Sequence, residues 1–188
     1  MEKFKINTNN SVLLVIDAQK NLAKAMKKEV YETIEKNINL LISSCKTLQI
    51  PIIETEQYAK GLGQTVEAVR DNLGGYYKPI EKMSFSCWNE PSFQEIFKQV
   101  NKKYVIMAGI ETHVCVLQTA LDMVSNNYYV HVISDAVCSR YKSDWKAALN
   151  YLNNCGSVIT TTEIVVFQLL QKAGTAEFKA ISTLFKNK

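Results

Sequence analysis

Four side chains in this sequence could do chemistry together, and three of them stand where a predicted strand or helix begins or ends. His113 and Cys115 lie two residues apart in the stretch GIETHVCV, while Asp17 and Lys82 lie far from them along the chain. A cysteine thiolate is a strong nucleophile, and an adjacent base is the usual means of producing it. The stretch could therefore hold a Cys–His nucleophile pair, half of a metal site, or simple packing.

His113 is badly placed to serve as the base. If Cys115 opens a helix, His113 lies about 200° away around the helix axis or precedes the helix altogether. A base must lie within roughly 3 Å of the proton it takes. His131 is the remaining histidine, and its place in the strand-like run YYVHVIS indicates a structural role. Because two histidines are too few for a histidine-rich metal site, we expect no metal and an activity insensitive to chelators.

The start of a helix can activate Cys115 without a histidine. Free backbone N–H groups and the positive end of the helix dipole lower the pKa of a thiol. The same N–H groups can hold an oxyanion. Asp17, directly after the first predicted strand, could supply the base. Lys82, in PIEKMSFSCW, is a candidate cation because its segment should lie over the same edge of the sheet.

The elements that must position these residues alternate between strands and helices. Short apolar runs such as 12–16 indicate strands covered on both faces, and apolar residues at helical spacing, as in 29–48, indicate helices. The alternation predicts one domain over residues 1–188, with a three-layer α/β/α fold and a mostly parallel central sheet. Functional groups gather at the carboxyl ends of such strands. We expect strands at 12–16, 51–55, 103–108, 128–134 and near 158–159, and helices at 29–48, 91–100, 114–125, 143–153, 162–172 and 175–185.

Composition excludes several classes of protein. The chain has 188 residues, of which 47% are hydrophobic and 21% charged, as expected of a globular domain. Its net charge of +4 comes from scattered lysines, which argues against binding of nucleic acid. No apolar run approaches the length of a membrane span, and the N-terminus does not read as a signal peptide. Five cysteines without a CxxC pair indicate a cytoplasmic protein with reduced thiols.

Six motifs are spread over nearly the whole chain. They are VLLVIDAQ (12–19), TEQYAKGLG (55–63), EKMSFSCW (81–88), GIETHVCVLQTALD (109–122), SDAVCSR (134–140) and TTTEIVVFQLL (160–170). Together they resemble one known family, the isochorismatase-like cysteine hydrolases, and six motifs in the family's order are far more specific than any one of them. The resemblance is closest to the small metal-free branch of isochorismatase domain-containing proteins.

The resemblance implies a catalytic triad of Asp17, Lys82 and Cys115 and no cofactor. It also implies a cis peptide bond between Ile110 and Glu111, which turns the Glu111 N–H toward the oxyanion beside the Cys115 N–H. On this interpretation Asp17 takes the thiol proton, Lys82 favours the thiolate, and Cys115 attacks a carbonyl carbon. Water then releases the acyl group. The expected function is hydrolysis of a C–N bond in a small amide or related compound through a Cys115 acyl-enzyme.

The sequence also departs from two branches of that family. Nicotinamidases carry an Asp-x-His element that helps to bind a metal, whereas the corresponding stretch here, Thr55–Tyr58, has no histidine. True isochorismatases usually lack the nucleophilic cysteine. Neither nicotinamide hydrolysis nor cleavage of a vinyl ether is therefore expected. Candidate residues of the substrate pocket, of which Phe85 and Trp88 could equally pack against the sheet, are Gln19, Tyr58, Phe85, Trp88 and His113.

Two other classes of function compete with the amidase interpretation. The chain could be an oligomeric scaffold or binding protein that keeps the triad without turnover, or it could have a nuclease-type activity. A nuclease should show a clustered basic face, which the scattered lysines do not provide. We expect a small-molecule substrate, no nucleic acid or membrane partner, and a homo-oligomer.

Overall fold

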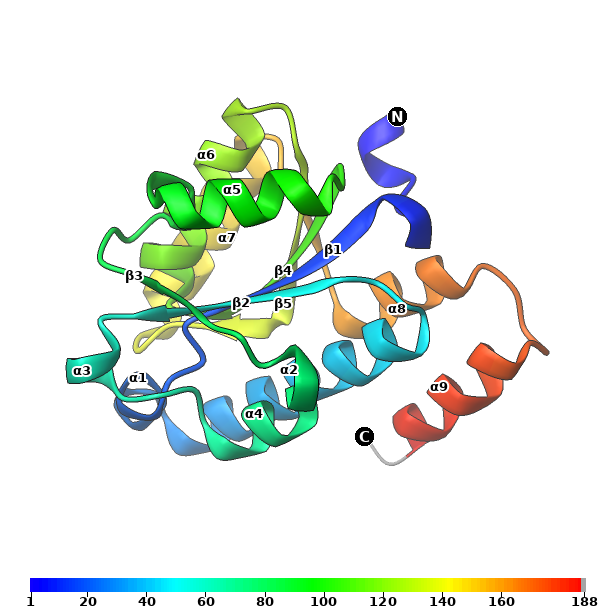
Figure 1. Ribbon diagram of the computed structural model, residues 1–188, viewed down its shortest axis with the longest axis horizontal. Coiled ribbons are helices and arrows are strands. Elements are labelled where there is room, and N and C mark those ends of the chain that lie inside the picture. The colour runs from blue at the N-terminus through cyan, green and yellow to red at the C-terminus, as the bar shows by residue number, and fades with distance from the viewer. Residues whose placement is uncertain (187–188) are drawn as a thin grey trace.

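A six-stranded sheet in which every strand is parallel to its neighbours forms the centre of the structure (Figure 1). The computed structural model describes residues 1–186. The strand order is β3-β2-β1-β4-β5-β6, so the chain builds outward from β1 in one direction and then in the other. Helices cover both faces, which confirms the predicted three-layer α/β/α fold.

The two central strands, β1 and β4, are buried at every position because helices cover both faces of the sheet. β1, Ser11–Ile16, is buried at every position and pairs with β2 on one side and β4 on the other. A continuous apolar run is the pattern expected of such a strand. The remaining strands are β2 Ile52–Gln57, β3 Ile80–Lys82, β4 Tyr104–Ile110, β5 Tyr129–Cys138 and β6 Val158–Thr160.

The helices form two layers with separate apolar cores. One layer, with α2 as its longest helix, packs on one face, and α5, α6 and α7 pack on the other (Figure 1). In α2 the buried Ile34, Ile38 and Leu41 follow the predicted helical spacing. The helices are α1 Lys20–Ala25, α2 Lys28–Thr47, α3 Ala59–Leu62, α4 Glu67–Leu73, α5 Pro91–Val100, α6 Leu117–Ser125, α7 Lys142–Asn154, α8 Thr162–Leu170 and α9 Ala176–Lys186. No helix within residues 1–186 is both long and apolar enough to cross a membrane.

Two differences from the predicted elements concern the site. The strand β3, which carries Lys82, was not predicted, because three residues show no periodicity. The helix expected over 114–125 begins earlier, with a π-helical turn over Thr112–Val116 that continues into α6. Single-turn π-helical segments are frequent at functional sites.

Two buried glutamates on β2 share one hydroxyl group. Thr65 Oγ1 lies 2.5 Å from Glu54 Oε1 and 2.8 Å from Glu56 Oε1. A hydroxyl group has one proton and can donate it to only one of these carboxyl groups. Burial, followed by repulsion from Glu56 and Asp17, raises the pKa of Glu54 from near 4.5 to about 7. Glu54 is therefore protonated in the folded chain over a range of pH in which an exposed glutamate is ionised.

We predict that Glu54→Gln stabilises the fold at pH 8. The folded-state pKa of Glu54 is raised. Its contribution to the free energy of unfolding is therefore fully present below about pH 4.5 and is lost as the pH rises through about 7. The amide carries no charge to bury, so the free energy of unfolding should rise by on the order of 1–3 kcal/mol at pH 8. The gain should disappear near pH 4.5. Urea unfolding at the two pH values measures it, with the exposed Glu81→Gln as the control. An equal gain at both pH values would contradict the assignment.

Candidate active site

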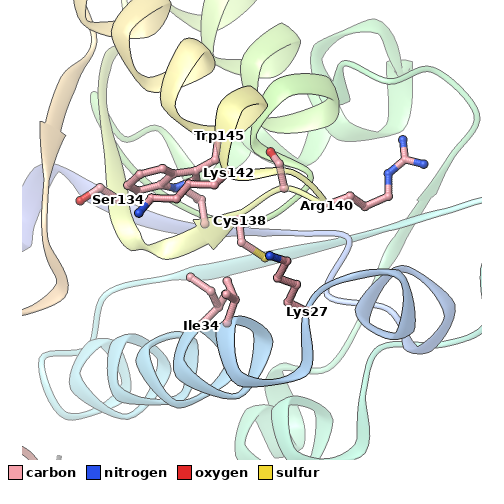
Figure 2. Close-up of a pocket in the computed structure, with 10 residues that line it drawn as sticks. Lys27, Ile34, Ser134, Cys138, Arg140, Lys142 and Trp145 are labelled. Carbon is pink, nitrogen blue, oxygen red and sulfur yellow. The ribbon is translucent and has the colours of Figure 1, made fainter.

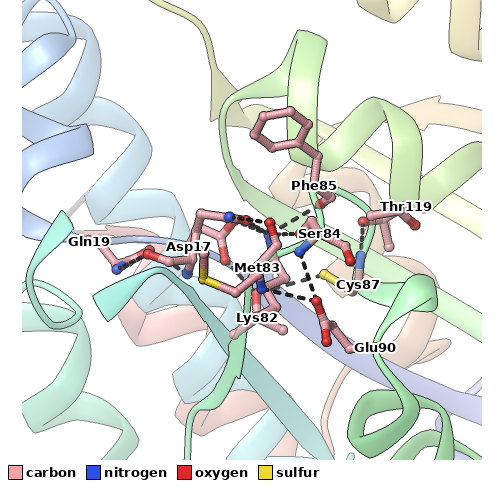
Figure 3. A network of polar contacts seen from close by, with 12 residues as sticks. Asp17, Gln19, Lys82, Met83, Ser84, Phe85, Cys87, Glu90 and Thr119 are labelled. Carbon is pink, nitrogen blue, oxygen red and sulfur yellow. Dashed lines mark hydrogen bonds and ion pairs between the residues drawn. The ribbon is translucent and has the colours of Figure 1, made fainter. Parts of the chain in front are cut away.

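A buried ion pair between Asp17 and Lys82 lies at the carboxyl edge of the sheet (Figure 3). Lys82 Nζ is 2.7 Å from Asp17 Oδ2, and both side chains are completely buried. Asp17 follows β1 directly, with a left-handed backbone (φ 49°) that is uncommon outside glycine. Its other oxygen, Oδ1, accepts a hydrogen bond of 2.7 Å from Thr55 Oγ1 on β2. A strained backbone and a buried charged side chain are both typical of functional sites.

Lys82 is held as an ammonium by several oxygen atoms. It donates to Gln57 Oε1 at 2.6 Å and to the backbone carbonyl oxygens of Ser84 and Phe85 at 3.3 and 3.1 Å. Burial alone would lower the pKa of Lys82, but the Asp17 carboxylate and the nearby thiols outweigh it, so that the net shift is upward. A permanent positive charge therefore lies beside Asp17.

Cys115 lies in the π-helical turn that opens α6, and its thiol is close enough to Asp17 and Lys82 for both charges to shift its pKa. The residue is only 5% exposed. Burial and the charge of Asp17 raise the pKa of the Cys115 thiol, and Lys82 opposes them only in part. The resting thiol is therefore protonated, and Asp17 is the nearby carboxylate that could accept its proton. Such an arrangement can generate a thiolate at the moment of attack.

The segment before Cys115 is shaped so that β4 ends beside β1. Gly109 has φ 122°, and a Cβ atom there would overlap the carbonyl oxygen of Ile16. Only glycine permits this close approach of the two strands. The peptide bond that joins Ile110 to Glu111 is cis. The N–H groups of Val114 and Val116 both donate to the Glu111 carbonyl oxygen.

Comparison with known proteins decides the family. The Isochorismatase domain matches residues 11–164. The chain belongs to the isochorismatase family. Isochorismatase family protein 1A of Dictyostelium discoideum is 40% identical over 184 residues, which cover 95% of this chain and 87% of that protein.

Two solved structures are similar to this chain in fold. The chain is similar to a protein from Caenorhabditis elegans described as MAR1 ribonuclease, with 36% identity and a TM-score of 0.89, over 97% of this chain and 92% of that one. It also shares the fold of the Escherichia coli YcaC gene product, described as an octameric hydrolase of unknown specificity. There the identity is 23% and the TM-score 0.87, over 97% and 90% of the two chains. The isochorismatase family contains hydrolases, which is the general kind of activity expected.

Both ring nitrogens of His113 in this isochorismatase-family chain face groups other than Cys115. Nδ1 lies 2.9 Å from Ser139 Oγ, and Nε2 lies 4.0 Å from Asp144 Oδ2. The Glu111 carboxylate also turns away, because its Oε2 accepts from the backbone N–H and the Nε of Arg140 at 3.1 and 3.0 Å. Neither side chain is therefore directed at the triad.

We predict that His113→Ala and Glu111→Gln each retain activity within about tenfold of the unmodified chain. Neither change removes a proton acceptor from the thiol, and the glutamine can still accept a hydrogen bond from Arg140. Steady-state kinetics and the rate of alkylation of Cys115 by iodoacetamide measure the effect. A loss of thiol reactivity in His113→Ala, with native circular dichroism, would instead support the Cys–His pair.

The other candidate pocket residues have different environments. Tyr58 and Phe85 are 50% and 53% exposed and come from the segments that follow β2 and β3. Gln19 is buried, and its amide bridges the backbone of Gln57 and the Gly63 carbonyl oxygen. The Trp88 ring packs edge-on against Phe93, Phe97 and Tyr128. This contact favours the packing alternative for Trp88, whereas Tyr58 and Phe85 remain available to a substrate.

Three residues near the site had no role assigned to them from the sequence. Thr55 and Gln57 occupy alternate positions of β2 and bind Asp17 and Lys82. Cys87 lies 3.8 Å from Thr55 Oγ1, and its N–H donates to Thr119 Oγ1 (Figure 3). Burial, with the charge of Asp17, raises the pKa of the Cys87 thiol to about 12. The period of two in a strand that ends at the site could have pointed to positions 55 and 57.

The described part of the chain contains no cluster of three or more His, Cys, Asp or Glu side chains arranged to hold a metal ion. In the segment Thr55–Tyr58 the side chains of Thr55 and Gln57 contact the triad itself. These two polar side chains therefore form hydrogen bonds with Asp17 and Lys82.

Proposed function

We propose that the chain hydrolyses a C–N bond of a small amide or related compound through an acyl-enzyme on Cys115. The observation that carries the proposal is the buried ion pair between Asp17 and Lys82, 2.7 Å apart, beside the buried Cys115 thiol, whose pKa both charges shift. This arrangement supplies a nucleophile, a base and a fixed cation at the carboxyl edge of a parallel sheet.

The proposed first half-reaction forms a thioester. Asp17 accepts the thiol proton while the Cys115 sulfur bonds to the carbonyl carbon, and the carbonyl oxygen becomes an oxyanion. The backbone N–H groups of Glu111 and Cys115 are proposed to bind that oxyanion. Collapse of the intermediate breaks the C–N bond, and the proton on Asp17 passes to the leaving amine. Lys82 keeps the carboxylate oriented throughout.

The second half-reaction regenerates the enzyme. Water loses a proton to Asp17 and attacks the thioester carbon, and the same N–H groups bind the second oxyanion. Cleavage of the C–S bond then releases a carboxylic acid, and the proton on Asp17 returns to the sulfur. The exposed Tyr58 and Phe85 are the side chains that we propose contact the substrate. We also propose that the protein works as a homo-oligomer in the cytoplasm.

A nuclease activity is the second candidate, because the Caenorhabditis elegans protein described as MAR1 ribonuclease is 36% identical to this chain. Hydrolysis of RNA requires attack at phosphorus, and phosphate contacts are usually made by clustered cations. A scaffold that keeps the triad but lacks turnover is the third candidate.

A panel of small primary and secondary amides distinguishes the three candidates. Release of ammonia or amine by the unmodified chain, and not by Cys115→Ala, would support the proposed amidase. Cleavage of a labelled RNA that is unaffected by Cys115→Ala would contradict it and favour the nuclease. No turnover of amide or RNA, despite stoichiometric alkylation of Cys115, would favour the scaffold.

A further inference from the structure

A cavity lies at the end of β5, between the starts of α2 and α7 (Figure 2). Its volume is about 290 Å³, close to the lower end of the range for small-molecule sites. None of the proposed triad residues lines it. The residues that do are Lys27, Val30, Ile34, Ser134, Val137, Cys138, Ser139, Arg140, Lys142 and Trp145.

The cavity has an apolar floor. Val30 and Ile34 come from the first two turns of α2, and Val137 and Trp145 come from β5 and α7. Val30 fits the apolar stripe of α2 in the sequence but is 43% exposed. Val30 therefore presents exposed apolar surface at the cavity. An apolar group that covers this surface removes it from water, which favours binding.

The rim of the cavity is positively charged. Three of its lining residues are cations, and none is an acid. Within residues 1–186 neither Lys27 nor Lys142 takes part in an ion pair. Arg140 differs from them, because it bonds to Glu111 and its guanidinium points away from the other lining residues (Figure 2). Two lysines are therefore available to an anion.

Two helix N-termini add to this positive charge. α2 has 20 residues and α7 has 13. The start of α2 lines the cavity through Val30 and the preceding residue Lys27, and the first turn of α7 lines it through Lys142 and Trp145. Neither helix start has a side-chain cap. Free backbone N–H groups and the positive end of the helix dipole favour an anion. The first turn of each helix also carries a carboxylate, Glu29 in α2 and Asp144 in α7, which offsets part of this charge. The two lysines therefore supply most of the positive charge at the rim.

We propose that this cavity binds a small organic anion, a carboxylate with an apolar body of roughly a dozen non-hydrogen atoms. The carboxylate lies between Lys27 and Lys142, and the apolar body covers Val30, Ile34 and Trp145. The apolar floor disfavours a purely inorganic anion, and the paired positive charge disfavours a neutral molecule. The site is separate from Cys115, and its occupancy does not depend on the proposed amidase activity.

Titration of the full chain with 3-phenylpropionate tests the proposal, with Trp145 fluorescence and calorimetry as readouts. Two control ligands are used: 3-phenylpropan-1-ol, a neutral analogue without the carboxylate, and inorganic phosphate, an anion without the apolar body. We expect the carboxylate to bind and each of the other two to bind at least about tenfold more weakly, which is 1.4 kcal/mol or more. Equal affinity for the carboxylate and the alcohol would overturn the anion assignment.

Two double variants test whether the carboxylate binds in this cavity. The double variant Lys27→Ala with Lys142→Ala should weaken the carboxylate at least about tenfold, since each charge-assisted contact contributes on the order of 1 kcal/mol or more. Lys28→Ala with Lys146→Ala removes the same charges from the same helices at positions that do not line the cavity, and it should bind as the unmodified chain does. Equal loss in both double variants would overturn the site. A lack of binding up to ~10 mM carboxylate would also overturn the site. That result is expected if a neighbouring subunit fills the cavity.

Discussion

Cys115→Ala should lose amide hydrolysis by a factor on the order of 10⁴ or more, with an unchanged fold. The alanine keeps the backbone N–H groups but removes the sulfur that must bond to the carbonyl carbon. Release of ammonia measures the loss, and circular dichroism checks the fold. The buried Cys87 offers a matched control, because it is a second thiol beside Asp17 and Lys82.

Cys87→Ala should stay within about tenfold of the unmodified chain. Its thiol donates to Thr55 Oγ1 at 3.8 Å, and it lies outside the turn that contains Cys115 and follows Glu111, so it is not positioned beside the proposed oxyanion-binding N–H groups. If Cys87→Ala were the inactive variant and Cys115→Ala the active one, the nucleophile would have been assigned to the wrong thiol.

Asp17→Asn should reduce hydrolysis by on the order of 10²–10⁴, because an amide cannot accept the thiol proton. The same change should lower the pKa of the Cys115 thiol. Asp17 raises that pKa and Lys82 lowers it, so removing the carboxylate leaves the ammonium to stabilise the thiolate. The variant would thus be inactive in hydrolysis and yet more readily alkylated near neutral pH.

The pH dependence of alkylation by iodoacetamide measures this second effect. In the unmodified chain the rate should keep rising well into the alkaline range, and in Asp17→Asn the rise should shift to lower pH. Because the change leaves Lys82 buried without its carboxylate, the fold is checked by thermal unfolding. The exposed Asp71→Asn is the control. A thiol pKa that rose further in Asp17→Asn, or full hydrolytic activity, would contradict the role of Asp17.

The long elements were predictable because their periodicity is carried by many residues. The buried run of β1 and the helical spacing in α2 each repeat one pattern over several positions. β3 could not be predicted in this way, because three residues carry no period. Lys82 was placed near the site by its segment, but its partner Gln57 depends on the pairing of β2 with β3. Such pairing is a property of the assembled sheet.

Side-chain environments at the site were harder to predict than positions along the chain. Trp88 stands in a motif beside Lys82, yet its ring packs with Phe93, Phe97 and Tyr128, which lie on other elements. The cavity at the end of β5 was not predicted at all, because Lys27 and Lys142 are more than a hundred residues apart. Only the fold brings the two helix starts together.

Mass spectrometry of the intact protein, quenched during reaction with each member of the amide panel, tests the central proposal most directly. The mechanism forms a thioester at Cys115, and water must remove it in a second step. We expect the chain to gain the mass of the acyl group, with the label on the peptide that contains Cys115 and none in Cys115→Ala. Turnover without any adduct under conditions that trap a thioester, or an adduct on a different residue, would contradict the Cys115 acyl-enzyme.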